Sequence, residues 1–156
     1  MKKNLSKFIA TFAGVGLFPI APGTVGSIAG IGVLWAISLV PYDYYQILLQ
    51  LLFLIVFIPI GVIASSAYEK YFGKIDPGEV VVDEVVGMMI TLFALPFSLF
   101  NIIVGFILFR FFDILKPFPI GKLQNIKGGW GVMADDIAAG IVSTIILRIL
   151  ITFIAK

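Results

Sequence analysis

The chain has 156 residues, of which 60% are hydrophobic and 13% are charged, and its mean hydropathy is +1.11. A soluble domain of this size could not cover its surface with so few polar side chains, so the composition predicts a membrane protein, with residues 1–156 forming a single domain. The net charge of +2 gives no indication of nucleic-acid binding, and the absence of histidine and cysteine limits any metal to oxygen ligands, which favours magnesium, calcium or manganese.

The N-terminus resembles a secretory signal, because three lysines precede an apolar stretch from Phe8 to Ile20. Pro22 fits poorly beside a cleavage site, and the apolar stretch is too short to span a bilayer comfortably. We therefore expect a retained interfacial or re-entrant segment, with a cleaved signal sequence as the alternative.

A short polar turn, Ala21–Ser27, leads into the apolar stretch from Ile28 to Val40. Thr24 is placed to cap a helix, and the exposed N–H groups of a helix start can bind a phosphate oxygen. An ordinary capped turn before a membrane helix explains the same pattern, and spacing alone favours this simpler interpretation.

Residues 46–67 are expected to return through the bilayer, and a turn at Pro77–Gly78 then introduces three acids, Glu79, Asp83 and Glu84. If a helix begins at this turn, Glu79 and Asp83 are four residues apart and share a face. Acidic side chains at the edge of an apolar run that continues to Pro96 are costly, which indicates a functional role.

The chain is then expected to cross back between Ile102 and Ile114, carrying Arg110 and Asp113 near the end of that helix. A long loop from Lys116 to Met133 follows, and Asp135 and Asp136 open the final helix. With five crossings, nine of the 11 basic residues and eight of the nine acidic residues fall on one side, which the positive-inside bias makes cytoplasmic.

Two pairs of adjacent acids, Asp83–Glu84 and Asp135–Asp136, therefore meet at one interface. Acids also stabilise helix N-termini, which could explain either pair alone. Clustered carboxylates repel one another, however, and a divalent cation is the usual way to neutralise them.

Cationic side chains accompany these acids. Arg110 could bind a phosphate in a bidentate manner, although an ordinary ion pair with Asp113 explains the same spacing. The glycines of Gly128–Gly131 form either an anion-binding nest or a flexible loop. A metal site beside cations at headgroup depth indicates metal-assisted hydrolysis of a lipid phosphate, with a covalent aspartyl-phosphate as the rival mechanism.

Four motifs of the chain together resemble the phosphatidylglycerophosphatase A family. They are Ala21–Ser27, Val82–Met88, Phe109–Ile120 and Gly128–Gly140, in that family's order. The chain departs from the family pattern at Val82, where many members carry an aromatic residue, and at Lys127, where a histidine is common.

The resemblance implies a Mg²⁺-dependent phosphatase of the bacterial inner membrane. Its substrate would be phosphatidylglycerophosphate, and its products phosphatidylglycerol and inorganic phosphate. The residues carried over by the motifs are Thr24, Asp83, Glu84, Arg110, Asp113, Lys116, Asp135 and Asp136.

We therefore expect an all-α, multi-pass bundle of about five membrane-embedded helices plus the N-terminal segment, with its active site facing the cytoplasm. The expected metal ligands are Asp83, Glu84, Asp135 and Asp136; the expected catalytic residues are Asp83, Glu84, Asp113 and Asp136; the expected phosphate-binding residues are Thr24, Arg110 and Lys116, with Glu79 at the edge. The main alternative is a proton- or cation-coupled transporter, which would need its acids spread along a path through the membrane. A non-catalytic membrane scaffold, with acids that only cap helices, is a further alternative.

Overall fold

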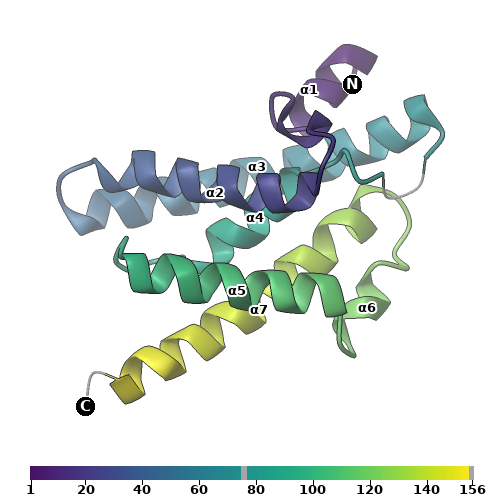
Figure 1. The fold of residues 1–156 in the computed structure, drawn as a ribbon. Helices are drawn as coiled ribbons and strands as arrows, with labels where there is room; N and C mark the ends of the chain where they lie inside the picture. Colours follow the sequence, from purple (N-terminus) through teal and green to yellow (C-terminus); the bar gives the residue numbers. More distant parts are fainter. Residues whose placement is uncertain (75–76, 155–156) are drawn as a thin grey trace.

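The computed structural model describes residues 1–74 and 77–154, and within these ranges every regular element is a helix (Figure 1). The all-α prediction is therefore confirmed for the described residues. In chain order the elements are α1 (Lys3–Ala10), the 3-10 helix η1 (Val15–Leu17), α2 (Pro22–Ser38), α3 (Asp43–Phe72), α4 (Val82–Thr91), α5 (Leu99–Leu115), α6 (Ile120–Leu123) and α7 (Gly129–Ile154).

Helix α4 is the centre of the bundle, with α2 and α3 packed on one side of it and α5 and α7 on the other (Figure 1). Eight of its ten residues are buried, among them Met88 and Met89. A helix of ten residues rises about 15 Å, which is half of the roughly 30 Å hydrocarbon core of a bilayer. Helix α4 is thus an internal helix surrounded by protein.

Small residues let the neighbouring helices approach α4 closely. A Cβ atom added to Gly140 of α7 would lie 2.6 Å from the carbonyl oxygen of Gly87, and one added to Gly30 of α2 would lie 3.0 Å from Cβ of Met88. Glycine at such positions is typical of helix packing in membranes, where dispersion contacts replace the hydrophobic effect.

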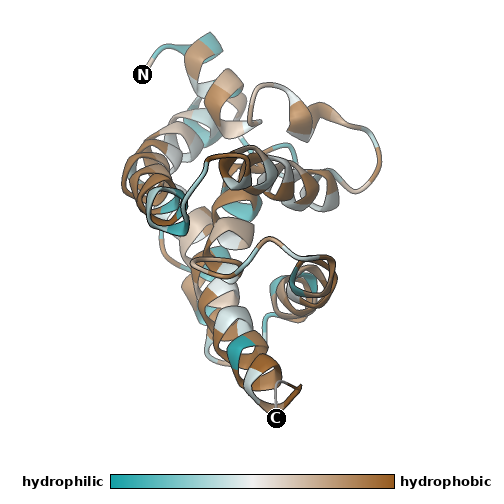
Figure 2. Ribbon diagram, turned by 90° about the vertical axis from the view of Figure 1, so that its left-hand side faces the viewer, coloured by the Kyte–Doolittle hydropathy of each residue, from teal (hydrophilic) through white to brown (hydrophobic). Residues whose placement is uncertain are grey.

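Two helices, α3 with 30 residues and α7 with 26, are long and apolar enough to cross a membrane. Less than a quarter of the apolar window in each is buried, at 17% and 22%, whereas the core helix of a soluble protein would be mostly buried. Large apolar side chains such as Ile55, Ile107 and Ile145 point outward, and hydrophobic residues cover much of the outer helices (Figure 2). The prediction of about five membrane-embedded helices goes beyond these two and stays a prediction.

Several helix starts differ from the predicted ones. Helix α2 begins at Pro22 with Ala21 as its N-cap, so Thr24 lies inside the first turn and the prediction that it caps the helix is wrong. Proline is favoured in the first turn because its missing N–H would have no intrahelical partner there. The turn at Pro77 is confirmed, since the Val80 N–H donates to the Pro77 carbonyl (2.9 Å), but α4 begins only at Val82.

The N-terminal segment forms α1 and η1, which pack on the rest of the bundle. Ser6 and Ala10 are buried, and α1 lies along α3 (Figure 1). The N–H of Val81, the residue before α4, donates to the Ala10 carbonyl (2.9 Å). The segment therefore supports the start of α4 in addition to presenting exposed apolar side chains such as Phe8.

Candidate functional site

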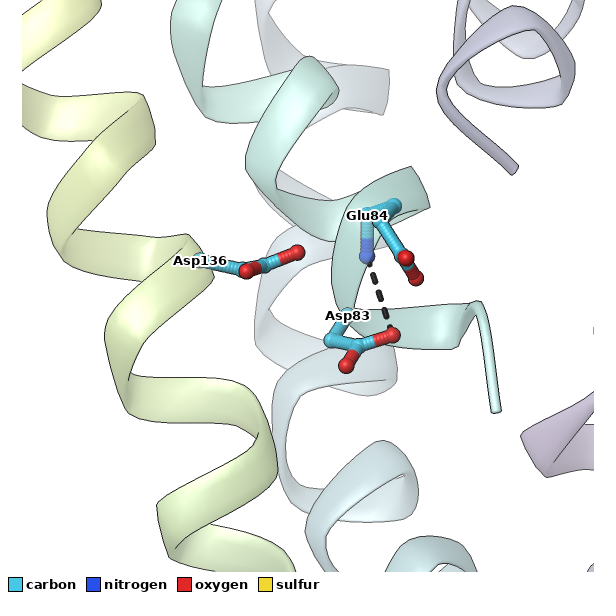
Figure 3. Close-up of side chains that lie close together, drawn as sticks. All are labelled: Asp83, Glu84 and Asp136. Carbon is cyan, nitrogen blue, oxygen red and sulfur yellow. Dashed lines mark hydrogen bonds between the residues drawn. The ribbon is translucent and has the colours of Figure 1, made fainter. Parts of the chain in front are cut away.

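Three of the predicted acids lie together where α4 begins. Asp83 and Glu84 belong to the first turn of α4, and Asp136 faces them from α7 (Figure 3). One carboxylate oxygen of each residue lies within 4.8 Å of one from each of the others. The Glu84 N–H donates to Asp83 Oδ1 (3.1 Å), which fixes the Asp83 side chain across the helix start.

These carboxylates are held away from solvent. Asp83 is 7% exposed and Asp136 is 3% exposed. Glu84 Oε2 and Asp136 Oδ2 are buried and have no hydrogen-bond partner among the described residues. The N-terminus of α4 stabilises two of the negative charges, but Asp136 lies in the second turn of a helix and gains less from its dipole. Buried, unpartnered carboxylate oxygens at this spacing fit a small divalent cation with oxygen ligands.

Helix α5 brings Arg110 and Asp113 to the same region. Arg110 Nη1 donates to Asp113 Oδ2 at 2.5 Å, and the longer contact to Ser27 Oγ of α2 measures 3.5 Å. Arg110 Nε is buried and has no hydrogen-bond partner among the described residues. The ordinary i,i+3 ion pair is thus present, and it leaves part of the guanidinium available for an anion.

The two adjacent acids of α7, Asp135 and Asp136, have different partners. Asp135 is buried and forms an ion pair with Lys116, the C-cap residue that follows α5, whereas Asp136 joins the carboxylate cluster. Both acids lie inside α7, which begins at Gly129, so the prediction that they open the final helix is wrong. Successive helical residues point about 100° apart, which is why neighbours in sequence have different surroundings.

The first turn of α2 forms one wall of the site. A Cβ atom added to Gly23 would overlap Glu84 Oε1 and would lie 3.3 Å from Arg110 Nη1. Ser27, one turn further along α2, is fully buried and donates from Oγ to the Gly23 carbonyl (2.9 Å). Thr24 lies beside this contact and is half-buried. Gly23 and Ser27 were not among the expected site residues, because their contacts with Glu84 and Arg110 depend on how α2 packs against α4 and α5.

Glu79 lies in the turn before α4 rather than on the face of Asp83, so the predicted shared helix face is wrong. Its side chain forms an ion pair with Lys74 (2.6 Å). The hydrogen bond from Lys74 holds the pKa of Glu79 below its usual value. Glu79 is therefore not part of the three-carboxylate cluster.

The glycine-rich stretch Gly128–Gly131 serves a packing role. The Gly129 N–H donates to Ser66 Oγ (2.7 Å), and a Cβ atom at Gly129 would overlap the Val62 carbonyl oxygen. The start of α7 is thus pressed against α3, and the Gly129 N–H is already engaged within the protein. The anion-nest interpretation finds no support at this position.

Fold and site together define an all-helical protein with an apolar exterior, a buried carboxylate cluster suited to a divalent cation, and adjoining cationic side chains. The chain belongs to the phosphatidylglycerophosphatase A family, whose sequence model matches residues 8–151.

Three relatives support this assignment. The phosphatidylglycerophosphatase A of Escherichia coli K12 is 40% identical over 141 residues, covering 89% of this chain and 79% of the relative. That of Haemophilus influenzae is 39% identical over 148 residues, covering 92% of this chain and 87% of the relative. A Bacteroides thetaiotaomicron protein, named as a provisional phosphatidylinositol-3-phosphatase, is 38% identical over 149 residues, covering 93% of this chain and 92% of the relative. No solved structure matches the chain significantly.

Proposed function

We propose that this protein is a Mg²⁺-dependent lipid phosphatase that hydrolyses phosphatidylglycerophosphate to phosphatidylglycerol and inorganic phosphate. The observation that carries the proposal is the buried cluster of Asp83, Glu84 and Asp136 beside the Arg110 guanidinium. Two relatives named phosphatidylglycerophosphatase A, each about 40% identical to the chain, support the substrate.

In this proposal, Asp83, Glu84 and Asp136 hold Mg²⁺. Asp135 forms an ion pair with Lys116 and is not among these three ligands. When bound, the ion neutralises the carboxylates and polarises the phosphoryl group for attack by water. Three carboxylate oxygens are a suitable donor set, because Mg²⁺ in proteins is usually bound by few carboxylates together with water and substrate phosphate.

Arg110 is the cationic side chain to which we assign phosphate binding. Arg110 would contact phosphate oxygens through the guanidinium nitrogen that has no partner, while Asp113 and Ser27 keep its orientation. The first turn of α2, with Thr24, lies next to Arg110 and would complete the phosphate site.

Hydrolysis breaks the bond between phosphorus and the headgroup oxygen, and the attacking water loses a proton as it adds to phosphorus. Asp136 has two carboxylate oxygens, and we assign one of them to the ion and the other to accepting this proton. The leaving alkoxide takes up the proton that Asp136 accepted and becomes the free hydroxyl of phosphatidylglycerol, which returns Asp136 to its ionised form.

We further propose that the protein is a multi-pass protein of the bacterial inner membrane, with this site facing the cytoplasm. The positive-inside bias supports that orientation, because with the five predicted crossings nine of the 11 basic residues would fall on the side of the site. The apolar outer faces of α3 and α7 support insertion in the bilayer.

A second candidate substrate is a phosphatidylinositol monophosphate, which the name of the Bacteroides relative favours. Both substrates are phosphate monoesters on a lipid headgroup and would use the same carboxylates. The transporter alternative has no comparable support, because the three carboxylates form one buried group where α4 meets α7 and do not follow a path along the bundle.

The test is phosphate release from phosphatidylglycerophosphate by the purified protein in detergent, with Mg²⁺ and then with a chelator. We expect release that stops on chelation and is lost in Asp83→Asn, whose fold is retained. Asp43→Asn is the matched control, because Asp43 is an exposed acid in the first turn of α3. Absence of release from folded wild-type protein with Mg²⁺ would refute the proposal.

A further inference from the structure

A polar cavity of about 470 Å³ lies where the α6–α7 connection meets the end of α3. Its lining includes Glu69 of α3, the consecutive residues Gln124, Asn125, Ile126 and Lys127 of the connection, and Val132 of α7. None of these residues has a role in the site described above.

The cavity adjoins the carboxylate cluster through α7. Val132 precedes Asp136 by four residues, so the two lie on the same face of the helix, about 6 Å apart along its axis. A ligand whose phosphate reaches Asp136 would therefore extend one turn back along α7, toward the cavity that Val132 helps to line.

The side chains around the cavity have a defined chemistry. Amide groups donate and accept hydrogen bonds, a carboxylate accepts them, and the ammonium of Lys127 attracts an anion. This combination matches a short hydroxyl-bearing linker joined to a phosphodiester. By contrast, a cavity of about 360 Å³ between α2 and α3 is lined by apolar side chains such as Val33 and Phe53 and would not recognise hydroxyl groups.

We propose that this cavity binds the polyol part of a lipid headgroup, the part that lies between the phosphodiester and the terminal phosphate. The inference rests on the proposed lipid phosphatase activity and extends it to headgroup selection. Asn125 hydrogen-bonds the free hydroxyl of that part, and Lys127 binds the phosphodiester. The connection between α6 and α7 is thus the specificity-determining segment.

The experiment compares Lys127→Ala and Asn125→Ala with wild-type protein in detergent micelles, with phosphatidylglycerophosphate as substrate. We expect each variant to raise KM by about three- to tenfold and to leave kcat within about twofold, since an exposed charged or polar contact contributes roughly 1 kcal/mol and acts on binding. Lys127→Arg should keep the wild-type KM, because it retains the charge.

Two controls separate the cavity from the rest of the molecule. Lys70→Ala removes an exposed lysine in the last turn of α3 that does not line the cavity, and its KM should match the wild type. Inhibition by inorganic phosphate tests the carboxylate site directly, and its inhibition constant should be the same in every variant.

The outcomes distinguish this inference from the proposed function. If wild-type protein releases phosphate but Lys127→Ala and Asn125→Ala keep its KM, the headgroup site is refuted and the activity stands. A rise in KM that Lys70→Ala reproduces would also refute it, because the effect would then be general electrostatics. If the wild type releases no phosphate from the lipid, the proposed function itself fails.

Discussion

Replacing Gly23 by alanine tests the geometry of the site most directly. The new Cβ atom would overlap Glu84 Oε1 and would lie 3.3 Å from Arg110 Nη1, so both a proposed metal ligand and the proposed phosphate ligand must move. Overpacking of this kind costs about 1–3 kcal/mol, and each 1.36 kcal/mol lost from transition-state stabilisation is about tenfold in rate. We expect Gly23→Ala to lower kcat/KM for phosphatidylglycerophosphate by roughly ten- to one-hundredfold.

Gly32→Ala is the matched control, because it makes the same change on the same helix where a Cβ atom meets no other atom within 4 Å. It should keep wild-type activity and gain up to about 1 kcal/mol of helix stability. Equal activities of Gly23→Ala and Gly32→Ala would refute the close contact between α2 and the Glu84 carboxylate.

A double variant tests the contact further. Glu84→Asp shortens the side chain by one methylene group and withdraws the carboxylate from the new methyl group. The combined Gly23→Ala/Glu84→Asp protein should therefore be more active than the product of the two single effects, with a coupling energy of about 1 kcal/mol. Simple additivity would show that Gly23→Ala acts elsewhere.

Three further predictions follow from contacts described above. In the presence of a chelator, Asp136→Asn should raise the Tm by about 2–4 °C for each kcal/mol of carboxylate repulsion removed. The same substitution should abolish the Tm increase that Mg²⁺ gives the wild type. An unchanged effect of Mg²⁺ on the Tm would contradict a metal role for Asp136. Lys74→Ala should keep full activity, and any loss in its Tm should disappear as the pH falls. The pKa of Glu79 is lower in the folded protein, so the ion pair stabilises the fold above the ordinary glutamate pKa and this stability is lost as the pH falls through the lower folded pKa. A Tm difference from wild type that grows in acid would contradict this. Ser66→Ala should destabilise the protein by about 1–3 kcal/mol, since it leaves the buried Gly129 N–H without its acceptor, and chemical denaturation at fixed detergent concentration would measure the loss.

The sequence was most informative about which residues meet. The expected order of crossings placed Asp83, Glu84 and Asp136 at one interface, and the structure brings these three residues together. The helical class also followed directly from composition. Both inferences depend on local chemistry, which a single sequence records well.

Contacts between helices were harder to predict. Asp135 and Asp136 look equivalent in the sequence, but the rotation of α7 pairs one with Lys116 and places the other in the cluster. The glycines of Gly128–Gly131 suggested a loop because glycine disfavours helices. Gly129 and Gly131 instead lie in the first turn of α7, where a larger residue at position 129 would collide with Val62 of α3.

The hydrogen bond between Val81 and Ala10 has a consequence for the order in which the protein is built. It joins residues 71 positions apart, so the final position of the α4 start includes a contact with the docked first helix. Asp136 is synthesised a further 53 residues after Asp83, so the carboxylate cluster is completed late, when α7 joins the bundle. Until then the early helices can enter the membrane without three buried negative charges in one place.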